Sequence, residues 1–367
     1  MREGWEYKKL GDSCVIEYGT RVVQKKDGGT IYPVYGGGGE TFRMDKYNRE
    51  NCLVVARFAM SRTCVRYVTG KFFLNDSGLS INAGKELLQS YLNHHILHLN
   101  DEIYNLGKGA AQRNLDVNSF RNLIITIPPL STQQSIVSEL DKINELIRLK
   151  KEQLNDYDNL AQSIFYEMFG DPVVNEKGWD FKKIGEIGTV ERGAGISKKD
   201  FVEDGLPCIH YGQLHTILGP TTRHHHSCIP ESLLPKYKIA HTNDVIMAIT
   251  SEDIEGSCKS TVWLGNYDIV IGSDAAILHH EQDGTFLSYY TMTKAFFNEK
   301  SKYAKGFKVT HISAKEIENI PVYLPPLALQ KDFAQRIELI EQQKAEIQST
   351  IADLETLLAS RMQYWFD

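Results

Sequence analysis

Two stretches of the chain repeat apolar residues in alternating steps of four and three, as a coiled coil does. The first runs from Ile136 to Met168 and the second from Phe333 to Trp365. A lone amphipathic surface helix rarely exceeds about 25 residues, so runs of this length favour two helices that pair with each other. The predicted seam consists of Ile136, Leu140, Ile143, Ile147, Leu154, Ile164, Phe333, Ile337, Ile340, Ile347, Ile351, Leu354 and Leu358.

The segments that precede these helices have the short apolar runs of β-strands. Residues 52–56 and 245–249 are examples, and Gly, Asn and Asp punctuate the chain between such runs. Each segment ends in one more apolar run and then a Pro-Pro pair, at residues 128–129 and 325–326, which stops a strand and opens a helix. We therefore expect an α+β protein with two β-rich domains, each followed by a long helix, the helices pairing as an antiparallel coiled coil.

The chain contains this arrangement twice, as an internal sequence repeat. Residues 5–11 (WEYKKLG) recur as residues 179–185 (WDFKKIG), and residues 127–130 (IPPL) recur as residues 324–327 (LPPL). The difference in residue number between the copies is larger for the second pair than for the first. Most of the extra length of the second copy falls between residues 213 and 242. The repeat predicts four parts, namely domains at 1–127 and 171–324 and helices at 128–170 and 325–367.

Length and composition bound the class of protein. The 367 residues suffice for two to three domains, and 42% hydrophobic with 24% charged residues indicate a folded chain. No apolar run approaches the length that spans a bilayer, and the first ten residues lack the apolar core of a signal peptide. The six scattered cysteines favour neither a disulfide scaffold nor a structural zinc site. We expect a cytoplasmic protein without a membrane segment.

The net charge of −6 is unevenly distributed. Residues 1–127 carry +4, whereas residues 128–170, 171–324 and 325–367 carry −3, −4 and −3. The whole-chain charge therefore does not predict nucleic-acid binding, and any affinity for DNA must be local or shared with a partner. The acidic helices suit protein partners better than phosphate.

This order of parts resembles the specificity subunit of type I restriction-modification systems. The resemblance covers the chain and rests on several segments that occur in order: the repeated residues 5–11, residues 31–37 (IYPVYGG), residues 109–120 and 306–317, and Pro-Pro-Leu-x-x-Gln at the start of each helix. It implies two target-recognition domains, each reading one half of a bipartite, asymmetric site in double-stranded DNA. It also implies that the helices set the spacer and dock methyltransferase subunits, two of them, with restriction/translocase subunits in the full complex.

Base reading requires Arg, Lys, Asn or Gln side chains on loops, and phosphate binding requires cations. In the first domain three arginines follow an apolar run, and a polar cluster precedes the last strand. In the second domain two lysines follow a Gly-rich segment, and two more occupy the counterpart of that polar cluster. The candidate DNA-contacting residues are Arg57, Arg62, Arg66, Lys108, Gln112, Arg113, Asn114, Lys198, Lys199, Lys305 and Lys308.

Two other readings of the sequence stay open. A coiled-coil scaffold that binds only proteins explains the helices but not the two domains before them. A DNA-modifying enzyme is the weaker alternative, because the Pro-Pro pairs lack the polar and aromatic neighbours that hold a flipped base. The consecutive histidines 224–226 have no metal-ligand spacing, so we predict a polar loop, no metal and no cofactor.

Overall fold

The structure, a computed structural model, describes residues 2–109, 112–232, 237–306 and 309–367. The chain divides into two compact units. Unit 1 consists of Met1–Glu152 together with Gln348–Asp367, and unit 2 is Gln153–Ile347. Each unit therefore contains one β-rich domain and part of each long helix. None of the helices among these residues is long and apolar enough to cross a membrane.

A six-stranded sheet in the order β2-β7-β5-β6-β3-β4 lies at the centre of unit 1. Its neighbours pair antiparallel, except that β3 and β6 are parallel. Strand β5 is buried on both faces, because Leu53 and Val55 enter one apolar cluster and Val54 enters another. The strands of this sheet are β2 (Cys14–Tyr18), β3 (Tyr32–Tyr35), β4 (Glu40–Met44), β5 (Arg49–Ala56), β6 (Val65–Leu74) and β7 (Gly78–Ala83).

Short elements surround this sheet. A small hairpin, β8 with β9, precedes the last strand of the domain. The tyrosine Tyr91 of helix α3 donates through its hydroxyl to the backbone oxygen of Thr126 (3.0 Å), which joins the helix to that last strand. These elements are β1 (Glu6–Lys9), α1 (Leu10–Ser13), α2 (Gln24–Asp27), α3 (Gln89–His98), α4 (Asn100–Asn105), β8 (Gly107–Lys108), β9 (Asn114–Leu115), α5 (Val117–Arg121) and β10 (Ile124–Ile127).

Two larger sheets lie in the described part of unit 2, besides two-stranded pairs. The first has the order β12-β21-β17-β19-β14 and the second β15-β13-β20-β16. Their strands are β12 (Gly188–Arg192), β13 (Leu206–Ile209), β14 (Thr221–Thr222), β15 (Ser227–Ile229), β16 (Lys238–Ala240), β17 (Val245–Ala248), β19 (Ser260–Trp263), β20 (Ile269–Ile271) and β21 (Ala275–His280). The remaining elements are β11 (Phe181–Lys183), α7 (Ile184–Ile187), the 3-10 helix η1 (Lys198–Asp200), α8 (Tyr211–Thr216), β18 (Thr250–Ser251), α9 (Gly284–Tyr290), α10 (Lys294–Lys300), β22 (Thr310–His311), α11 (Ala314–Ile317) and β23 (Pro321–Tyr323).

The extra residues of the second copy form regular secondary structure. Residues 213–242 contribute to helix α8 and to strands β14, β15 and β16. The three histidines lie in the turn between β14 and β15, and His225 Nδ1 is 2.6 Å from the hydroxyl of Tyr267. The extra residues therefore supply β15 and β16, the two edge strands of the four-stranded sheet of unit 2.

The sequence repeat has the same structure in both units. Strand β1 pairs antiparallel with β10, and β11 pairs antiparallel with β23, so the opening motif lies beside the strand that precedes each Pro-Pro pair. The glutamine of each Pro-Pro-Leu-x-x-Gln segment is fully buried. Gln133 Nε2 donates to the backbone oxygen of Pro128, and Gln330 Nε2 donates to that of Pro325, both at 2.8 Å. Each glutamine thus ties the strand end to the first turn of the helix.

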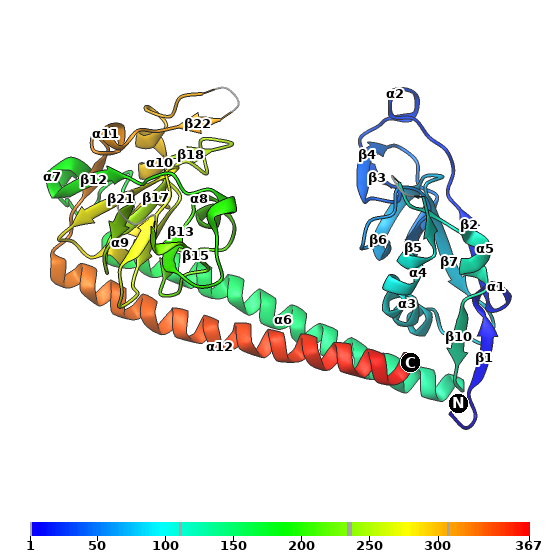
Figure 1. The fold of residues 1–367 in the computed structure, drawn as a ribbon. Helices are drawn as coiled ribbons and strands as arrows, with labels where there is room; N and C mark the ends of the chain where they lie inside the picture. The colour runs from blue at the N-terminus through cyan, green and yellow to red at the C-terminus, as the bar shows by residue number, and fades with distance from the viewer. Residues whose placement is uncertain (1, 110–111, 233–236, 307–308) are drawn as a thin grey trace. The chain divides into compact units, whose positions relative to one another are not determined.

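Helices α6 (Leu130–Phe169) and α12 (Leu327–Phe366) run alongside each other in opposite directions (Figure 1). In unit 1, Lys151 Nζ lies 2.8 Å from a carboxylate oxygen of Glu355. Trp365 Nε1 donates to Glu139 at 2.9 Å. In unit 2, Lys344 lies 2.7 Å from Asp158. From the start to the end of α6, the contacting residues of α12 have decreasing residue numbers. The expected antiparallel pairing is therefore confirmed.

Most of the predicted seam positions are buried, and some are only partly so. The buried ones are Ile136, Leu140, Ile143, Ile147, Phe333, Ile337, Ile340, Ile347 and Ile351. Leu154, Ile164, Leu354 and Leu358 are half-buried. Near the end of α6, Phe165 and Phe169 are buried instead of Ile164.

Both ends of the chain contribute to unit 1. The guanidinium carbon of Arg2 is 4.7 Å from the ring centre of Trp5 and 5.6 Å from that of Trp365, and the two indoles stack with centres 6.4 Å apart. The next residue, Phe366, is 5% exposed and stacks on His95 with ring centres 4.6 Å apart. The last turn of α12 is therefore part of the core of the first domain.

Candidate nucleic-acid interface

The side chain of Arg57 lies between two aromatic rings at the surface of unit 1. Its guanidinium carbon is 4.3 Å from the ring centre of Phe58 and 4.9 Å from that of Tyr18. Its Nη1 donates to the backbone oxygen of Asp76 at 3.2 Å. Phe58 and Tyr18 remain 37% and 47% exposed. Cation–π contacts of this kind orient the guanidinium and leave donors open to a ligand.

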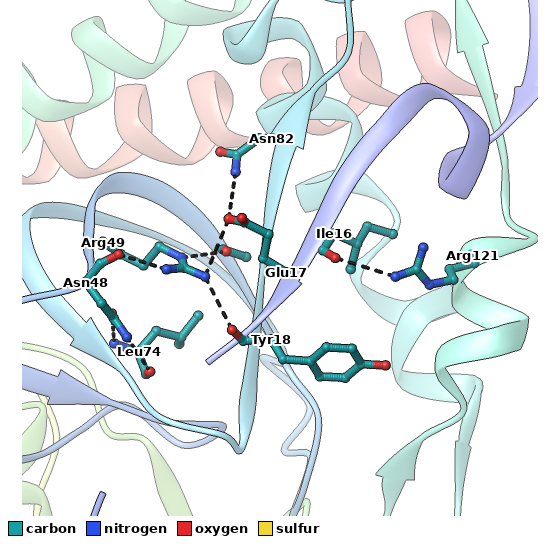
Figure 2. Close-up of polar contacts among 9 residues, drawn as sticks. Ile16, Glu17, Tyr18, Asn48, Arg49, Leu74, Asn82 and Arg121 are labelled. Atoms are coloured by element: carbon teal, nitrogen blue, oxygen red, sulfur yellow. Dashed lines mark hydrogen bonds and ion pairs between the residues drawn. The ribbon is translucent and has the colours of Figure 1, made fainter. Parts of the chain in front are cut away.

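The backbone of Tyr18 is held by Arg49, an arginine that the sequence does not single out. Figure 2 shows Arg49 between Glu17, Tyr18 and Asn48. Its Nη2 donates to the backbone oxygen of Tyr18 (3.3 Å), its Nη1 to that of Asn48 (2.8 Å) and its Nε to the buried hydroxyl of Ser80 (2.8 Å). Because each of its three nitrogens donates within the domain, we interpret Arg49 as a residue that positions Tyr18.

Two more arginines contact the ring of Tyr104, at the end of α4. The guanidinium carbon of Arg113 is 4.7 Å from the ring centre, and that of Arg62 is 5.5 Å away. Arg113 Nη1 also donates to the backbone oxygen of Tyr104 at 3.1 Å. The backbone oxygen of Arg113 accepts from the amide of Met60 (2.9 Å), so the loop after β5 is joined to the β8–β9 hairpin.

The fourth arginine fixes the Gly-rich turn between β3 and β4. Arg66 Nη2 donates to the backbone oxygens of Gly37 (2.9 Å) and Thr63 (3.0 Å). A Cβ at Gly37 would lie 2.5 Å from the backbone oxygen of Phe58, and Gly39 has a φ of +127°. The glycines are therefore required by a tight turn packed on the arginine-bearing loop.

We call Arg57, Arg62, Arg66 and Arg113 the arginine cluster. Its members come from the loop after β5, the start of β6 and the β8–β9 hairpin, and hydrogen bonds join these segments. The guanidinium nitrogens of Arg57, Arg66 and Arg113 donate to backbone oxygens, and no carboxylate pairs with any of the four arginines within the described residues. A guanidinium that keeps its charge and some of its donors can bind a phosphate or the O6 and N7 atoms of guanine.

The other candidates of the first domain lie on or beside the same hairpin. Lys108 makes an ion pair with Asp116, and that carboxylate also accepts from backbone amides at the start of α5. Asn114 Oδ1 accepts from the amide of Ala59 at 3.3 Å, which is again a bond within the domain. Gln112 is exposed. Lys108 and Asn114 therefore support the shape of the hairpin, whereas Gln112 and the arginine cluster are free to contact a ligand.

We expect the substitution Lys108→Ala to raise the pKa of Asp116. The Lys108 ammonium, the main cause, and a backbone amide lower that pKa from 3.8 to about 2. Because the folded-state pKa is lowered, the contact stabilises the hairpin above the ordinary pKa and stops doing so as the pH falls through about 2. An NMR titration of the carboxyl carbon should show a pKa above the wild-type value but below 3.8 in the variant, because the backbone amide remains, and about 2 in a Lys46→Ala control. A value that stays near 2 in Lys108→Ala would assign the effect to the backbone amide alone.

The described candidate cations of unit 2 lie in two separate segments of the chain. Lys305 Nζ lies 2.7 Å from Glu316, a residue of the capping box of α11, which repeats the Lys108 arrangement of unit 1. Lys198 and Lys199 are exposed on η1. Lys308 lies outside the described residues. The described part of unit 2 thus shows one adjacent lysine pair and one ion-paired lysine, and the arginine cluster is particular to unit 1.

Three aromatic residues of this surface were not predicted from the sequence. The rings of Tyr18, Phe58 and Tyr104 contact the arginine side chains, yet Tyr18 and Tyr104 are separated from their arginine partners by 9 to 42 residues. Only the adjacent pair Arg57-Phe58 left a local signal, namely a large aromatic next to a cation directly after a strand. Pairs formed through the fold leave no spacing that a single sequence can show.

Comparison with known proteins shows which family the chain matches. Residues 2–156 and 176–355 match the family described as type I restriction modification DNA specificity domain. The type I restriction enzyme MjaVIII specificity subunit of Methanocaldococcus jannaschii is 25% identical over 258 residues, which are 64% of this chain and 59% of that protein. The chain spans about three fifths of the length of the curated relatives it matches in this organism.

Solved structures share the fold along almost the whole chain. The S subunit of the type I restriction-modification system from M. genitalium is 15% identical and superposes with a TM-score of 0.58, covering 99% of this chain and 96% of the other. A chain from a structure of complex assembly and conformational transition of the type I R-M system is 19% identical, with a TM-score of 0.56 and coverage of 99% and 97%. At these identities the likeness concerns the architecture of two domains and two paired helices.

Proposed function

We propose, from the premise that this chain belongs to the type I restriction modification DNA specificity family, that it is the DNA-reading subunit of a type I restriction-modification complex. In this proposal each domain reads one half of a bipartite, asymmetric site in double-stranded DNA, and the paired helices set the spacer between the halves. The chain itself catalyses no reaction and requires no cofactor. The observation that carries the proposal is the arginine cluster of unit 1.

The arginine cluster has the properties of a surface that reads bases. Its four guanidinium groups are oriented by aromatic rings and backbone oxygens, and the described residues provide no carboxylate for them. Because these side chains are already oriented, binding loses less side-chain conformational entropy. The described part of unit 2 has a different surface, with an adjacent lysine pair on η1 and no arginine cluster, which supports two different half-sites.

The helix pair has features of a surface that binds other proteins. Leu146, Leu149 and Leu357 are 45–47% exposed on α6 and α12 within unit 1. Acidic residues such as Glu145 and Glu355 lie beside them in the sequence. Apolar residues with acidic neighbours fit a protein partner better than phosphate. We assign this surface to methyltransferase subunits, two per chain, with restriction/translocase subunits joining in the full complex.

The proposal is tested by removing two members of the arginine cluster in the assembled complex. Arg57→Ala and Arg113→Ala should each weaken binding to the cognate site by about 1–3 kcal/mol where the side chain reaches a base. A contact to phosphate would instead reduce the salt dependence and leave sequence preference unchanged. Affinity is measured by fluorescence anisotropy at several salt concentrations.

The control is Arg336→Ala, which removes an arginine of unit 2 that pairs with Asp332 on α12. It should leave both the affinity and the salt dependence unchanged. If the two cluster variants behave like this control, the arginine cluster is not the reading surface. If the wild-type chain co-purifies with a methyltransferase subunit but the assembly shows no sequence preference, the scaffold alternative holds.

A further inference from the structure

A groove of about 860 Å³ lies within unit 2, beside the C-terminal half of α6. Its walls come from α6, from α12, from the loop before β14, from residues 255–260 and from helices α9 and α10. Four lysines line it, together with the apolar side chains of Met292 and Phe297. The arginine cluster belongs to unit 1, so this groove is a separate feature.

One of the four lysines is buried with no carboxylate partner. Lys300 is 4% exposed, and its ammonium donates to the backbone oxygens of Glu255 (2.8 Å) and Ser257. No carboxylate of the described residues lies within ion-pair distance of it, and burial lowers its pKa. A buried charge without a counter-ion costs free energy, which an arriving carboxylate would recover in part.

Two exposed lysines of the groove also lack an acidic partner among the described residues. Lys259 Nζ donates to the backbone oxygen of His215 at 3.1 Å, and Lys294 stands at the start of α10. The fourth lysine, Lys344, is already neutralised, because it lies 2.7 Å from Asp158 and 2.9 Å from Glu341. With Glu255 as the one further acidic residue of its lining, the groove keeps a positive balance.

The groove also exposes apolar surface beside these charges. Met292 is 54% exposed and Phe297 is 38% exposed. A DNA backbone offers phosphates and sugars, and its protein partners are polar surfaces. A recess that places methionine and phenylalanine next to three lysines fits a protein segment with a carboxylate beside an apolar side chain.

The first domain has no such feature at the matching position. The offset of 197 residues that relates the two Pro-Pro-Leu segments places Ile103 where Lys300 stands. Ile103 is fully buried in the apolar cluster of unit 1. The fold therefore accepts an apolar side chain here, and the lysine of unit 2 is not needed for packing.

We propose that this groove, lined by Lys259, Lys294 and Lys300, receives an acidic and apolar segment of the methyltransferase subunit. The inference rests on the proposed function and deepens it. The contact lies on the domain of unit 2, apart from the exposed leucines of the helix pair in unit 1. It makes the two domains unequal as docking sites for their partners.

The test compares the full-length wild-type chain with variants in binding to its companion methyltransferase subunit, by isothermal titration calorimetry. The double variant Lys259→Glu/Lys294→Glu should bind at least about tenfold more weakly, and the wild-type affinity should fall with salt more steeply than that of the variant. Lys300→Met keeps the packing and should weaken binding severalfold. The matched control is Lys302→Glu, which removes a lysine two residues further on that pairs with Glu299 and does not line the groove.

Each outcome decides the matter. A wild-type chain that assembles, with groove variants that assemble equally well, overturns this inference and leaves the proposed function standing. Variants that assemble normally but lose DNA affinity with a smaller salt dependence would show that the lysines bind phosphate, which also overturns it. A wild-type chain that binds no methyltransferase subunit overturns both. Thermal unfolding of every variant establishes that Lys300→Met and the double variant are folded.

Discussion

A complex whose two long helices are each lengthened by one heptad is expected to recognise a DNA site whose spacer is longer by about three base pairs. Helix α6 runs without interruption from unit 1 into unit 2, and α12 pairs with it in both units. Seven helical residues add about 10 Å at 1.5 Å per residue, and base pairs are spaced about 3.4 Å apart. A complete heptad preserves the phase of the seam.

The insertions are duplications placed at the same level of the helix pair. Residues 148–154 are repeated after Leu154, and residues 341–347 are repeated after Ile347. The pairs Lys151–Glu355 and Lys344–Asp158 enclose this level from its two sides. Affinity is measured on duplexes that carry the cognate half-sites with spacers extended by zero to four base pairs.

The control duplicates the heptad in α6 alone, which leaves the added turn without a partner and should weaken recognition at every spacer. Three added base pairs also rotate one half-site by about a quarter turn or more, so the longer helices should prefer the spacer that best satisfies length and twist together. Recognition of the original spacer with undiminished affinity would show that the helices do not set the distance.

The second large effect concerns the stability of unit 2. Phe333→Ala is expected to lower the free energy of unfolding by about 3–5 kcal/mol, the usual cost of removing a buried aromatic ring. Phe333 is fully buried, and its ring centre lies 5.6 Å from that of Phe165, 5.3 Å from Phe169 and 5.2 Å from Tyr289. The ring therefore joins α12 to both α6 and α9.

The matched control for this change is Leu339→Ala on the same helix. Leu339 is 63% exposed, so its truncation should change the free energy of unfolding by less than about 0.5 kcal/mol. Urea unfolding monitored by hydrogen exchange reports unit 2 separately from unit 1. A loss below about 1 kcal/mol for Phe333→Ala would mean that the helices and the domain are held together by other contacts.

The architecture was predictable because its signals are periodic and repeated. The steps of four and three located both helices, and the glutamine of Pro-Pro-Leu-x-x-Gln marks a strand-to-helix junction with identical hydrogen bonds in the two units. At the end of α6 the heptad rule gave Ile164, whereas Phe165 and Phe169 are buried against Phe286 of α9. The heptad rule fails there because α9 of the second domain, and not only α12, packs against the end of α6.

The candidate interface was predictable only in part. The three arginines after β5 were found because cations follow a strand there, and Arg113 because its polar segment recurs. The three nitrogens of Arg49 donate inside the domain (Figure 2), whereas Arg57 donates one hydrogen bond there, from its Nη1, and no sequence pattern reports this difference. That difference depends on which backbone oxygens the fold brings within reach.

The composition of unit 1 from both ends of the chain has a consequence for biosynthesis. Unit 2 is one continuous segment, so all of its residues are synthesised before the last part of unit 1. Unit 1 is completed only when residues 348–367 have left the ribosome, because Trp365 and Phe366 belong to its packing. The first domain to be synthesised is thus the last to be finished. A premature stop that removes the final turn of α12 would deprive the first domain of part of its core while leaving the second intact.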